Sequence, residues 1–197
     1  MQDLGSTLQY STLFLLILWR LYWDITEKRA EHEKPKKREK VKLLHKKNLS
    51  MIITFGAFLP VTFQLVGFEI LPFPKEYAWM QMAGFGLVLL GWLISVRGRH
   101  DLGTNWARSY NYQIKDKQEL VTSGVYKYIR HPIYSGIMFM FIGSELIVQS
   151  YLVLAYLLLY YGVFLQTKWE ETLLIEHFGK AYKVYMGKTK RLIPFIW

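Results

Sequence analysis

The chain contains no cysteine among its 197 residues. Disulfide bonds, thiolate metal sites, iron–sulfur clusters and cysteine nucleophiles are therefore excluded together. Acidic residues are also few, because 15 Asp and Glu stand against 25 Lys and Arg and leave a formal charge of +10. Charge is almost missing from the stretch Ile137 to Leu165, where Glu145 is the single charged side chain in 29 residues. A soluble core does not need so long an apolar run, so the sequence indicates a membrane protein.

The common signatures of nucleotide, metal and nucleic-acid binding are missing as well. The patterns GxGxxG, GxxxxGK[ST] and GxSxG do not occur, and the histidines form neither an HExxH motif nor another ligand cluster. We therefore expect no metal ion. No aromatic residue lies between Glu27 and Asn48, so the basic segment there has no means of stacking on bases, and we expect no nucleic-acid partner.

Three apolar segments precede residue 97. A helix of about 20 apolar residues crosses the hydrocarbon core, which predicts a short first span at Leu8 to Trp23, a second at Leu49 to Leu71 and a third at Tyr77 to Val96. The first lacks the basic start and small-residue cleavage site of a signal peptide, so we expect a retained anchor. The third has three glycines that allow close approach of another helix, in the same chain or in a dimer: Gly84, Gly86 and Gly91.

The long apolar block is predicted to be a hairpin. As one helix, Ile137 to Leu165 would be about 43 Å long, well above the hydrocarbon thickness of about 30 Å. The polar pair Gln149-Ser150 interrupts it and is the expected turn. Two further spans follow, at about 133–166, and bring the total to five.

The distribution of positive charge predicts the orientation of these spans. Segments 24–48, 97–132 and 168–197 contain ten, seven and six Lys or Arg, which is 23 of the 25 in the chain. The positive-inside rule places all three in the cytoplasm and the N-terminus outside, which requires an odd number of spans. Segment 24–48 is expected to be an exposed polar loop, either a solvated tether or a binding site for anionic lipid or nucleic acid.

The predicted fold class is thus all-α, an integral membrane bundle of about five transmembrane helices with a cytoplasmic C-terminal region. Residues 1–96 are expected to hold three spans and the basic loop. Residues 97–197 are expected to hold the functional site, the hairpin and a cytoplasmic C-terminal helix. In that last helix an apolar stripe is expected to pack on the protein: Leu174, Phe178, Tyr182 and Tyr185.

Two polar clusters flank the hairpin. Arg130 and His131 precede Pro132, which combines a permanent cation and an imidazole with the free N–H groups of a helix start, so the cluster suits a carboxylate or phosphate. The same residues would also be found at an ordinary cytoplasmic start of a membrane helix, where a proline begins the helix and positive side chains reach the headgroups. Glu170 and Glu171 come within about a turn of the fifth span, where a carboxylate needs a cation. Because neighbours on a helix point about 100° apart, we expect one to face inward and the other to be solvated.

In order and spacing, these clusters resemble the isoprenylcysteine carboxyl methyltransferase family. The resemblance is carried by the run Gly124 to Tyr134, by Glu170-Glu171 after the hairpin, and by Phe178 to Tyr182, with Leu102 to Trp106 upstream. It covers roughly residues 97–194. Phospholipid N-methyltransferases and sulfide or thiol methyltransferases share much of the pattern, and sterol reductases share a weaker form.

The resemblance implies an integral membrane, multi-pass enzyme that uses S-adenosylmethionine on the cytoplasmic side. The partners it implies are a lipophilic methyl acceptor, which enters from the bilayer, and the surrounding membrane lipids. The cofactor-binding residues it implies are Tyr126, Arg130, His131, Pro132, Tyr134, Glu170 and Glu171. The catalytic residues it implies are Arg130, Glu171 and Asn105.

The acceptor implied is the C-terminal carboxylate of an isoprenylcysteine, with a phospholipid amine or a thiol as alternatives. Carboxyl methyltransferases of this family usually carry an arginine shortly before the acidic pair, where this chain has Gln166 and Lys168. Lys168 is a point charge without the planar fork of arginine. Two other functions remain as alternatives: a noncatalytic membrane adaptor that presents the basic loop, and an NADPH-linked sterol reductase.

Overall fold

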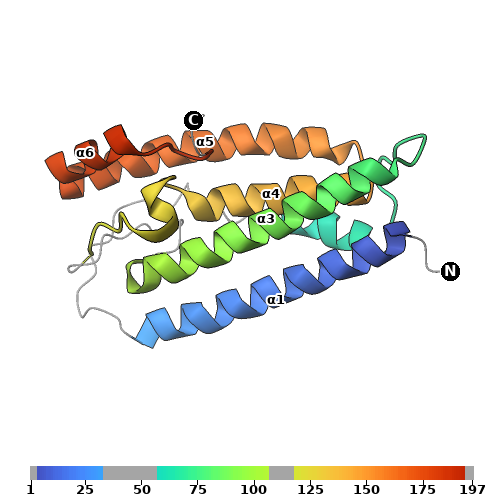
Figure 1. Ribbon diagram of the computed structural model, residues 1–197, viewed down its shortest axis with the longest axis horizontal. Helices are drawn as coiled ribbons and strands as arrows, with labels where there is room; N and C mark the ends of the chain where they lie inside the picture. The colour runs from blue at the N-terminus through green and yellow to red at the C-terminus, as the bar shows by residue number, and fades with distance from the viewer. Residues whose placement is uncertain (1–3, 33–56, 107–117, 194–197) are drawn as a thin grey trace.

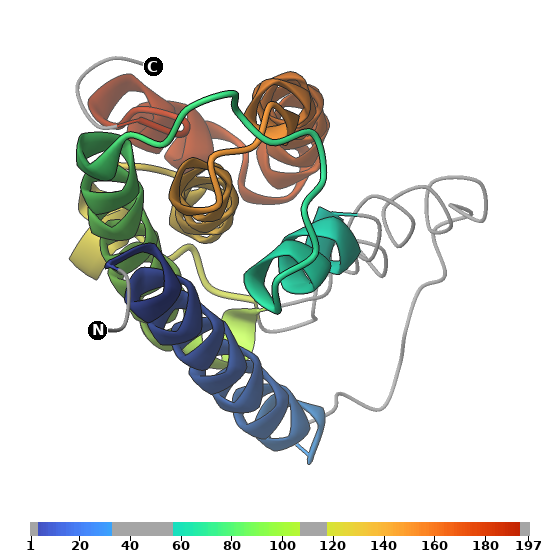
Figure 2. The same ribbon diagram turned by 90° about the vertical axis from the view of Figure 1, so that its right-hand side faces the viewer.

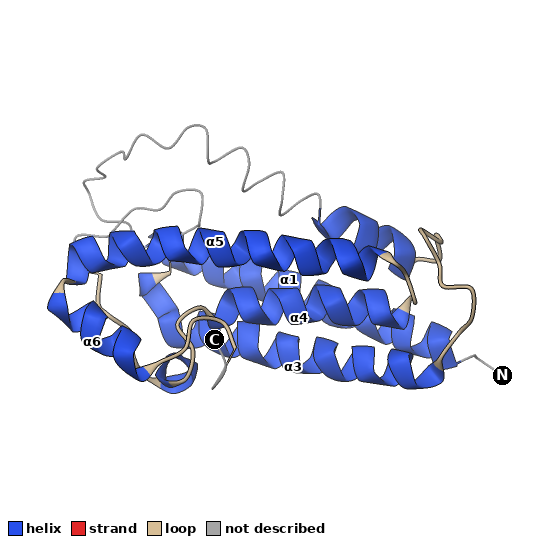
Figure 3. Ribbon diagram, turned by 90° about the horizontal axis from the view of Figure 1, so that it is seen from above, coloured by secondary structure: helices blue, strands red, loops and turns tan. Residues whose placement is uncertain are grey.

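The structure, a computed structural model, describes residues 4–32, 57–106 and 118–193 (Figure 1). Those residues form helices joined by turns and loops, and none of them lies in a β-strand (Figure 3). The expected all-α fold is therefore confirmed. The elements in chain order are α1 (Leu4–His32), a helical segment at 57–65, α3 (Ala78–Leu102), the 3₁₀ turns η1 (Gly103–Asn105) and η3 (Gly124–Lys127), α4 (Pro132–Ile147), α5 (Leu152–Phe178) and α6 (Lys180–Lys188).

The long helices form a bundle in which α4 is the inner member. Figure 2 shows α4 between α3 and α5, with the segment 57–65 on its remaining side and α1 against α3. Helices α1, α3 and α5 run in one direction and α4 in the other (Figure 1). The last turns of α1, α3 and α5 and the first turn of α4 therefore share one end of the bundle, which is the end where the basic segments begin.

Close backbone packing joins α3 to α4. A Cβ atom added to Gly84 would lie 2.6 Å from the carbonyl oxygen of Gly143, and one added to Gly136 would lie 2.5 Å from that of Gly91. No side chain fits at such distances, so these glycines let the two helix backbones touch. The sequence left open whether these glycines pack against a helix of the same chain or of a dimer partner. Gly84 and Gly91 pack within the chain, whereas Gly86 has no atom within 4 Å of its added Cβ.

Indole hydrogen bonds fasten α1 to α3. Trp19 Nε1 donates to Ser95 Oγ at 2.9 Å, and Trp92 Nε1 donates to the Leu15 carbonyl at 3.1 Å. Trp19 also stacks on Trp23, with ring centroids 4.8 Å apart. Both indole N–H groups, of the buried Trp19 and the half-buried Trp92, thus have partners at the same contact.

At the opposite end of the bundle from the basic segments, the turn 148–151 joins α4 to α5. It contains Gln149 and Ser150, where the sequence predicted a turn. The Gln149 side chain accepts from the Tyr77 N–H at 2.9 Å and donates to the Tyr77 carbonyl at 2.8 Å, while Ser150 Oγ donates to the Ile70 carbonyl at 2.7 Å. The turn is thereby held to the loop before α3.

The prediction of a loop beginning at residue 24 is wrong for residues 24–32, which continue α1 to His32. The physical reason is a buried guanidinium at the end of α3: Arg99, 2% exposed, donates to the Thr26 carbonyl at 2.9 Å and lies 4.5 Å from the Trp106 ring centroid. Glu27 is buried in the same region, at 9% exposure. Residues 33–48 of the predicted loop lie outside the described residues.

Two other helices end at residues different from those predicted. The helical segment at 57–65 ends six residues before Leu71, because the chain turns at Gly67, whose φ of 103° is left-handed; residues 49–56 of that span lie outside the described residues. Helix α3 continues past Val96 to Leu102 and is then ended by Gly103 at φ 52°. The predicted C-terminal stripe is broken in the same way, because Gly179 at φ 58° separates α5 from α6.

Two described helices, α3 and α5, are long and apolar enough to cross a membrane by length and composition, and α4 is a shorter apolar helix. Large apolar side chains on α3 and α5 point outward: Leu93 is 59% exposed and Leu158 is 76% exposed. Such a surface is typical of a lipid-facing helix. The count of five spans stays a prediction.

The α3–α4 contact generates a test. Gly91→Ala is expected to lower the stability of the protein by about 1 to 3 kcal/mol, because the added methyl group must push two helix backbones apart. Gly86→Ala, on the same helix, is the matched control and should leave stability unchanged or slightly raised. Thermal unfolding in a mild detergent measures both variants. Equal midpoints for Gly91→Ala and Gly86→Ala would contradict the packing.

A buried ionic cluster as the candidate functional site

The candidate site lies at the end of the bundle shared by η3, the start of α4, the second half of α5, and α6 (Figure 1). Beyond α6 the chain turns back and runs along the segment that precedes α4 (Figure 3). Arg130 N–H donates to the Lys190 carbonyl at 2.9 Å, His131 N–H donates to the Arg191 carbonyl at 3.0 Å, and Lys190 N–H donates to the Tyr128 carbonyl at 3.1 Å. This short ladder brings residues 189–192 beside residues 128–131.

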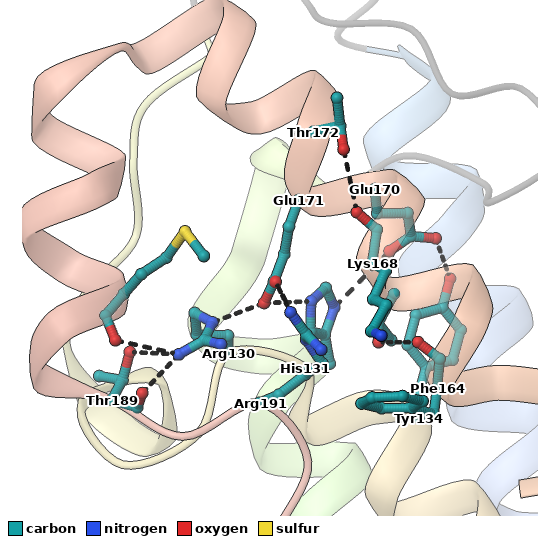
Figure 4. Close-up of polar contacts among 12 residues, drawn as sticks. Arg130, His131, Tyr134, Phe164, Lys168, Glu170, Glu171, Thr172, Thr189 and Arg191 are labelled. Carbon is teal, nitrogen blue, oxygen red and sulfur yellow. Dashed lines mark hydrogen bonds and ion pairs between the residues drawn. The ribbon is translucent and has the colours of Figure 1, made fainter. Parts of the chain in front are cut away.

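Glu171 is the centre of the site (Figure 4). Its Oε1 accepts a hydrogen bond from Arg130 Nε at 2.6 Å, and its Oε2 accepts from both Nε, at 3.0 Å, and Nη2 of Arg191. His131 Nε2 lies 3.4 Å from Oε1, yet Nε2 is buried and its geometry forms no hydrogen bond. One carboxylate, with 3% of its side chain exposed, is thus held between two guanidiniums and an imidazole.

Glu170 faces a different set of partners. Tyr134 O–H donates to its Oε1, and Gln166 Nε2 donates to the same oxygen at 3.5 Å. His131 Nδ1 lies 3.6 Å from its Oε2, so the imidazole stands between the two glutamates. Figure 4 shows Tyr134 and Glu170 on one side of His131 and Arg130 with Glu171 on the other.

The expectation that one glutamate would be solvated is wrong, because both are buried, Glu170 at 3% and Glu171 at 2% exposure. The two side chains do leave α5 in different directions, but both directions are covered. Tyr134 on α4 covers the first, and Arg130 and Arg191 cover the second. The helix is enclosed on both sides by segments that are distant in sequence.

Arg130 also holds α6 in place. Its Nη1 donates to the Met186 carbonyl at 3.3 Å, to the Thr189 carbonyl, and to Thr189 Oγ1 at 3.4 Å. Among the described residues, none accepts a hydrogen bond from its Nη2. The N–H groups of Nη2 are therefore left for a ligand, whereas Nε and Nη1 are occupied.

Tyr126 and Tyr185 join η3 to α6 beneath this cluster. Tyr185 O–H donates to the Tyr126 carbonyl at 2.7 Å. Burial raises the pKa of Tyr126, and burial likewise raises that of Tyr182 and Tyr185, far above the usual range of a phenol. These phenols are therefore neutral at physiological pH, and Tyr185 is a hydrogen-bond donor. Asp101 at the end of α3 positions η3, because its Oδ2 accepts the Val125 N–H at 2.9 Å.

The structure brings together most of the residues that the sequence singled out: Arg130, His131, Tyr134, Glu170 and Glu171 are in mutual contact, Pro132 begins α4, and Tyr126 lies buried below them. Asn105 is placed elsewhere by its hydrogen bond, since its Oδ1 accepts from the Glu119 N–H at 2.9 Å. The role of Asn105 stays a prediction.

Sequence reasoning missed Arg191 and Thr189. Neither belongs to a recognisable motif, and only the ladder between residues 128–131 and 189–192 brings them to Glu171 and Arg130. The available signal was indirect, because a buried carboxylate requires cations and the C-terminal segment contains six of them. Lys168 does not fill this position: it is exposed, and its Nζ lies 4.7 Å from the Phe164 ring centroid.

The chemistry of the cluster fits the polar groups of S-adenosylmethionine. A carboxylate ligand needs N–H donors; His131 Nε2 is a buried ring nitrogen without a hydrogen-bond partner, and Arg130 Nη2 donates to none of the described residues. An ammonium ligand needs a carboxylate, which Glu170 provides. Flat apolar surface for an adenine is available from the partly exposed ring of Tyr134, whereas Tyr126 is buried at 6% exposure.

Comparison with known proteins agrees with this arrangement. The sequence profile of the phospholipid methyltransferase family (PEMT) matches residues 79–181, which is more than half of the chain. The matched range runs from α3 to the start of α6 and includes Arg130, His131, Tyr134, Glu170 and Glu171; Tyr182, Tyr185, Met186, Thr189 and Arg191 lie beyond it. The chain belongs to this family.

Curated relatives carry the name protein-S-isoprenylcysteine O-methyltransferase. The probable enzyme from rice (Oryza sativa) is 29% identical over 153 residues, which cover 75% of this chain and 80% of the rice protein. The Xenopus laevis enzyme is 33% identical over 129 residues, or 64% of this chain and 45% of that one. The human enzyme is 30% identical over 124 residues, or 62% and 44%. The chain thus spans less than half of the vertebrate proteins it matches.

A solved structure has a similar fold. The eukaryotic intramembrane Ras methyltransferase ICMT, an isoprenylcysteine carboxyl methyltransferase, superimposes with a TM-score of 0.58 at 25% sequence identity. The similarity covers 76% of this chain and 53% of that structure. The fold of this chain is therefore that of a membrane methyltransferase.

The cluster itself can be tested by removing its central charge. Glu171→Gln is expected to lower stability by about 3 kcal/mol, because two guanidiniums lose their shared carboxylate in a buried setting. Glu176→Gln, on an exposed face of the same helix, is the matched control and should change stability by less than about 0.5 kcal/mol. Chemical unfolding in detergent compares the two. A similar small effect for both would show that Glu171 is not the centre of the cluster.

Proposed function

We propose that this protein transfers a methyl group from S-adenosylmethionine to the C-terminal carboxylate of an isoprenylcysteine, forming a methyl ester. The proposal rests mainly on one observation: Arg130 and His131 contact the glutamate pair in one buried cluster. The family match and the named relatives support the same reaction class. A carboxylate acceptor also agrees with a site rich in guanidinium groups.

The cofactor site we propose consists of Tyr126, Arg130, His131, Pro132, Tyr134, Glu170 and Glu171. S-adenosylmethionine, when bound, supplies an electrophilic methyl group, whose bond to sulfur breaks as a bond to the acceptor oxygen forms. The residues of the chain contribute binding and orientation. Arg130 Nη2 and His131 Nε2 offer N–H groups to a carboxylate, and Glu170 offers an acceptor to an ammonium.

No general base is required for this reaction. A carboxylate acceptor is already ionised at neutral pH. The protein therefore contributes chiefly by holding the donor and the acceptor in line and by excluding water from the site. The buried tyrosines suit this role, because they are neutral and line the cluster without adding charge.

We propose a multi-pass topology with the cluster on the cytoplasmic side and the N-terminus outside. Helices α1 and α3 end and α4 begins at the shared end of the bundle, next in the sequence to the basic segments that the positive-inside rule assigns to the cytoplasm. A reporter enzyme fused after Trp197 is expected to report the cytoplasm, and one fused before Met1 the outside. An external signal from the Trp197 fusion would reverse the topology.

Cofactor binding is the first test of the reaction class. Titration calorimetry of the protein in detergent is expected to detect S-adenosylmethionine. Arg130→Gln should weaken that binding at least about 10-fold, since a charged hydrogen bond contributes about 1.5 to 3 kcal/mol. Lys127→Gln removes an exposed cation three residues away and is the matched control. Absence of binding by the wild-type protein, or equal binding by Arg130→Gln, would contradict the proposed cofactor site.

The acceptor is tested with three compounds and labelled cofactor: N-acetyl-S-farnesylcysteine, phosphatidylethanolamine and a simple thiol. Base-labile label on the farnesylcysteine is the expected result, because a methyl ester hydrolyses in base. The family description favours a second candidate, methylation of a phospholipid amine. Base-stable label on phosphatidylethanolamine alone would establish that reaction instead, and label on the thiol alone would assign a thiol methyltransferase.

A further inference from the structure

We propose that Arg191 binds the carboxylate of the methyl acceptor; this inference rests on the proposed function and names the residue that recognises its substrate. Arg191 lies outside the residues matched to the family and outside every motif in the sequence. Its position follows from the ladder that fixes residues 189–192 against the start of α4.

The hydrogen bonds of Arg191 leave a complete recognition edge unused. A guanidinium has five N–H groups in a planar arrangement and can receive carboxylates at two edges. Glu171 Oε2 occupies the edge formed by Nε and Nη2. Among the residues that the structure describes, none accepts from Nη1. The edge formed by Nη1 and the remaining Nη2 hydrogen is therefore available to a second carboxylate while Glu171 stays in place.

The surroundings of Arg191 match an acceptor that is polar at one end and lipophilic at the other. Its Cζ lies 5.1 Å from the ring centroid of Phe164, which belongs to the apolar part of α5. Arg191 thus contacts both the carboxylate of Glu171 and the apolar part of α5 (Figure 4). An isoprenylcysteine keeps its prenyl chain in lipid while its carboxylate reaches such a boundary.

The other two cations of the site suit this role less well. Arg130 already donates to Glu171, Met186 and Thr189 and has 8% of its side chain exposed, against 19% for Arg191. Lys168 is an ammonium without paired, coplanar N–H groups, so it cannot form the two parallel bonds of a guanidinium with a carboxylate. Arg191 combines the geometry, the open edge and the access.

Steady-state kinetics of the full chain in detergent test the proposal, with N-acetyl-S-farnesylcysteine as acceptor. Arg191→Gln is expected to raise the KM for this acceptor about 10- to 100-fold, the loss expected for charged hydrogen bonds. The S-adenosylmethionine dissociation constant should change much less, because Arg130 still holds Glu171. Arg191→Lys should be intermediate, because it restores the charge without the planar fork. Lys183→Gln, an exposed charge loss on α6, is the matched control and should behave as the wild type.

Competition with the uncharged amide of the same farnesylcysteine adds a readout that general damage would not move. The wild type should bind the carboxylate more tightly than the amide, and Arg191→Gln should bind the two equally. An unchanged acceptor KM in Arg191→Gln overturns the inference, as does a loss of cofactor affinity that matches the loss of acceptor affinity. Failure of the wild type to bind S-adenosylmethionine would instead refute the proposed function. Methylation of neutral acceptors alone would refute the proposal that the acceptor group is a carboxylate.

Discussion

The structure around the site depends on the burial of one carboxylate. Glu171 has almost no contact with solvent, and an unpaired charge in such a place is strongly destabilising. Its two oxygens require cations, and they take Arg130 from the segment before α4 and Arg191 from the C-terminal segment. Three parts of the chain that are far apart in sequence thereby meet at one residue.

That meeting also depends on how the helices are packed. Gly84 and Gly91 let α3 touch α4 along its length, so the start of α4 is held at the end of the bundle where α3 and α5 finish. Arg130 and His131 are then presented to the glutamate pair of α5. Because α6 turns back at Gly179, the segment after it reaches Arg130 and completes the enclosure.

Much of the candidate site could be recognised in the sequence, because its parts are contiguous there. The run Arg130-His131-Pro132 and the pair Glu170-Glu171 each combine unusual chemistry with a position beside an apolar span, where charge is costly. Arg191 could not be recognised, since it has no motif and its contact with Glu171 spans twenty residues and a turn. The prediction that one of the two glutamates would be solvated was wrong for the same reason, because the segments that cover Glu170 and Glu171 are distant from them in the sequence.

The sequence by itself determined the helical class and the turn at Gln149-Ser150, and it predicts five apolar spans and the side on which positive charge collects. These are local properties, set by hydrophobicity and charge along short windows. Only the tertiary structure decided that α1 continues to His32, that the glycines of α3 serve packing within the chain, and which cation meets which carboxylate. Such pairings depend on contacts between distant residues, where the requirement to neutralise buried charge selects one arrangement from the many cations available.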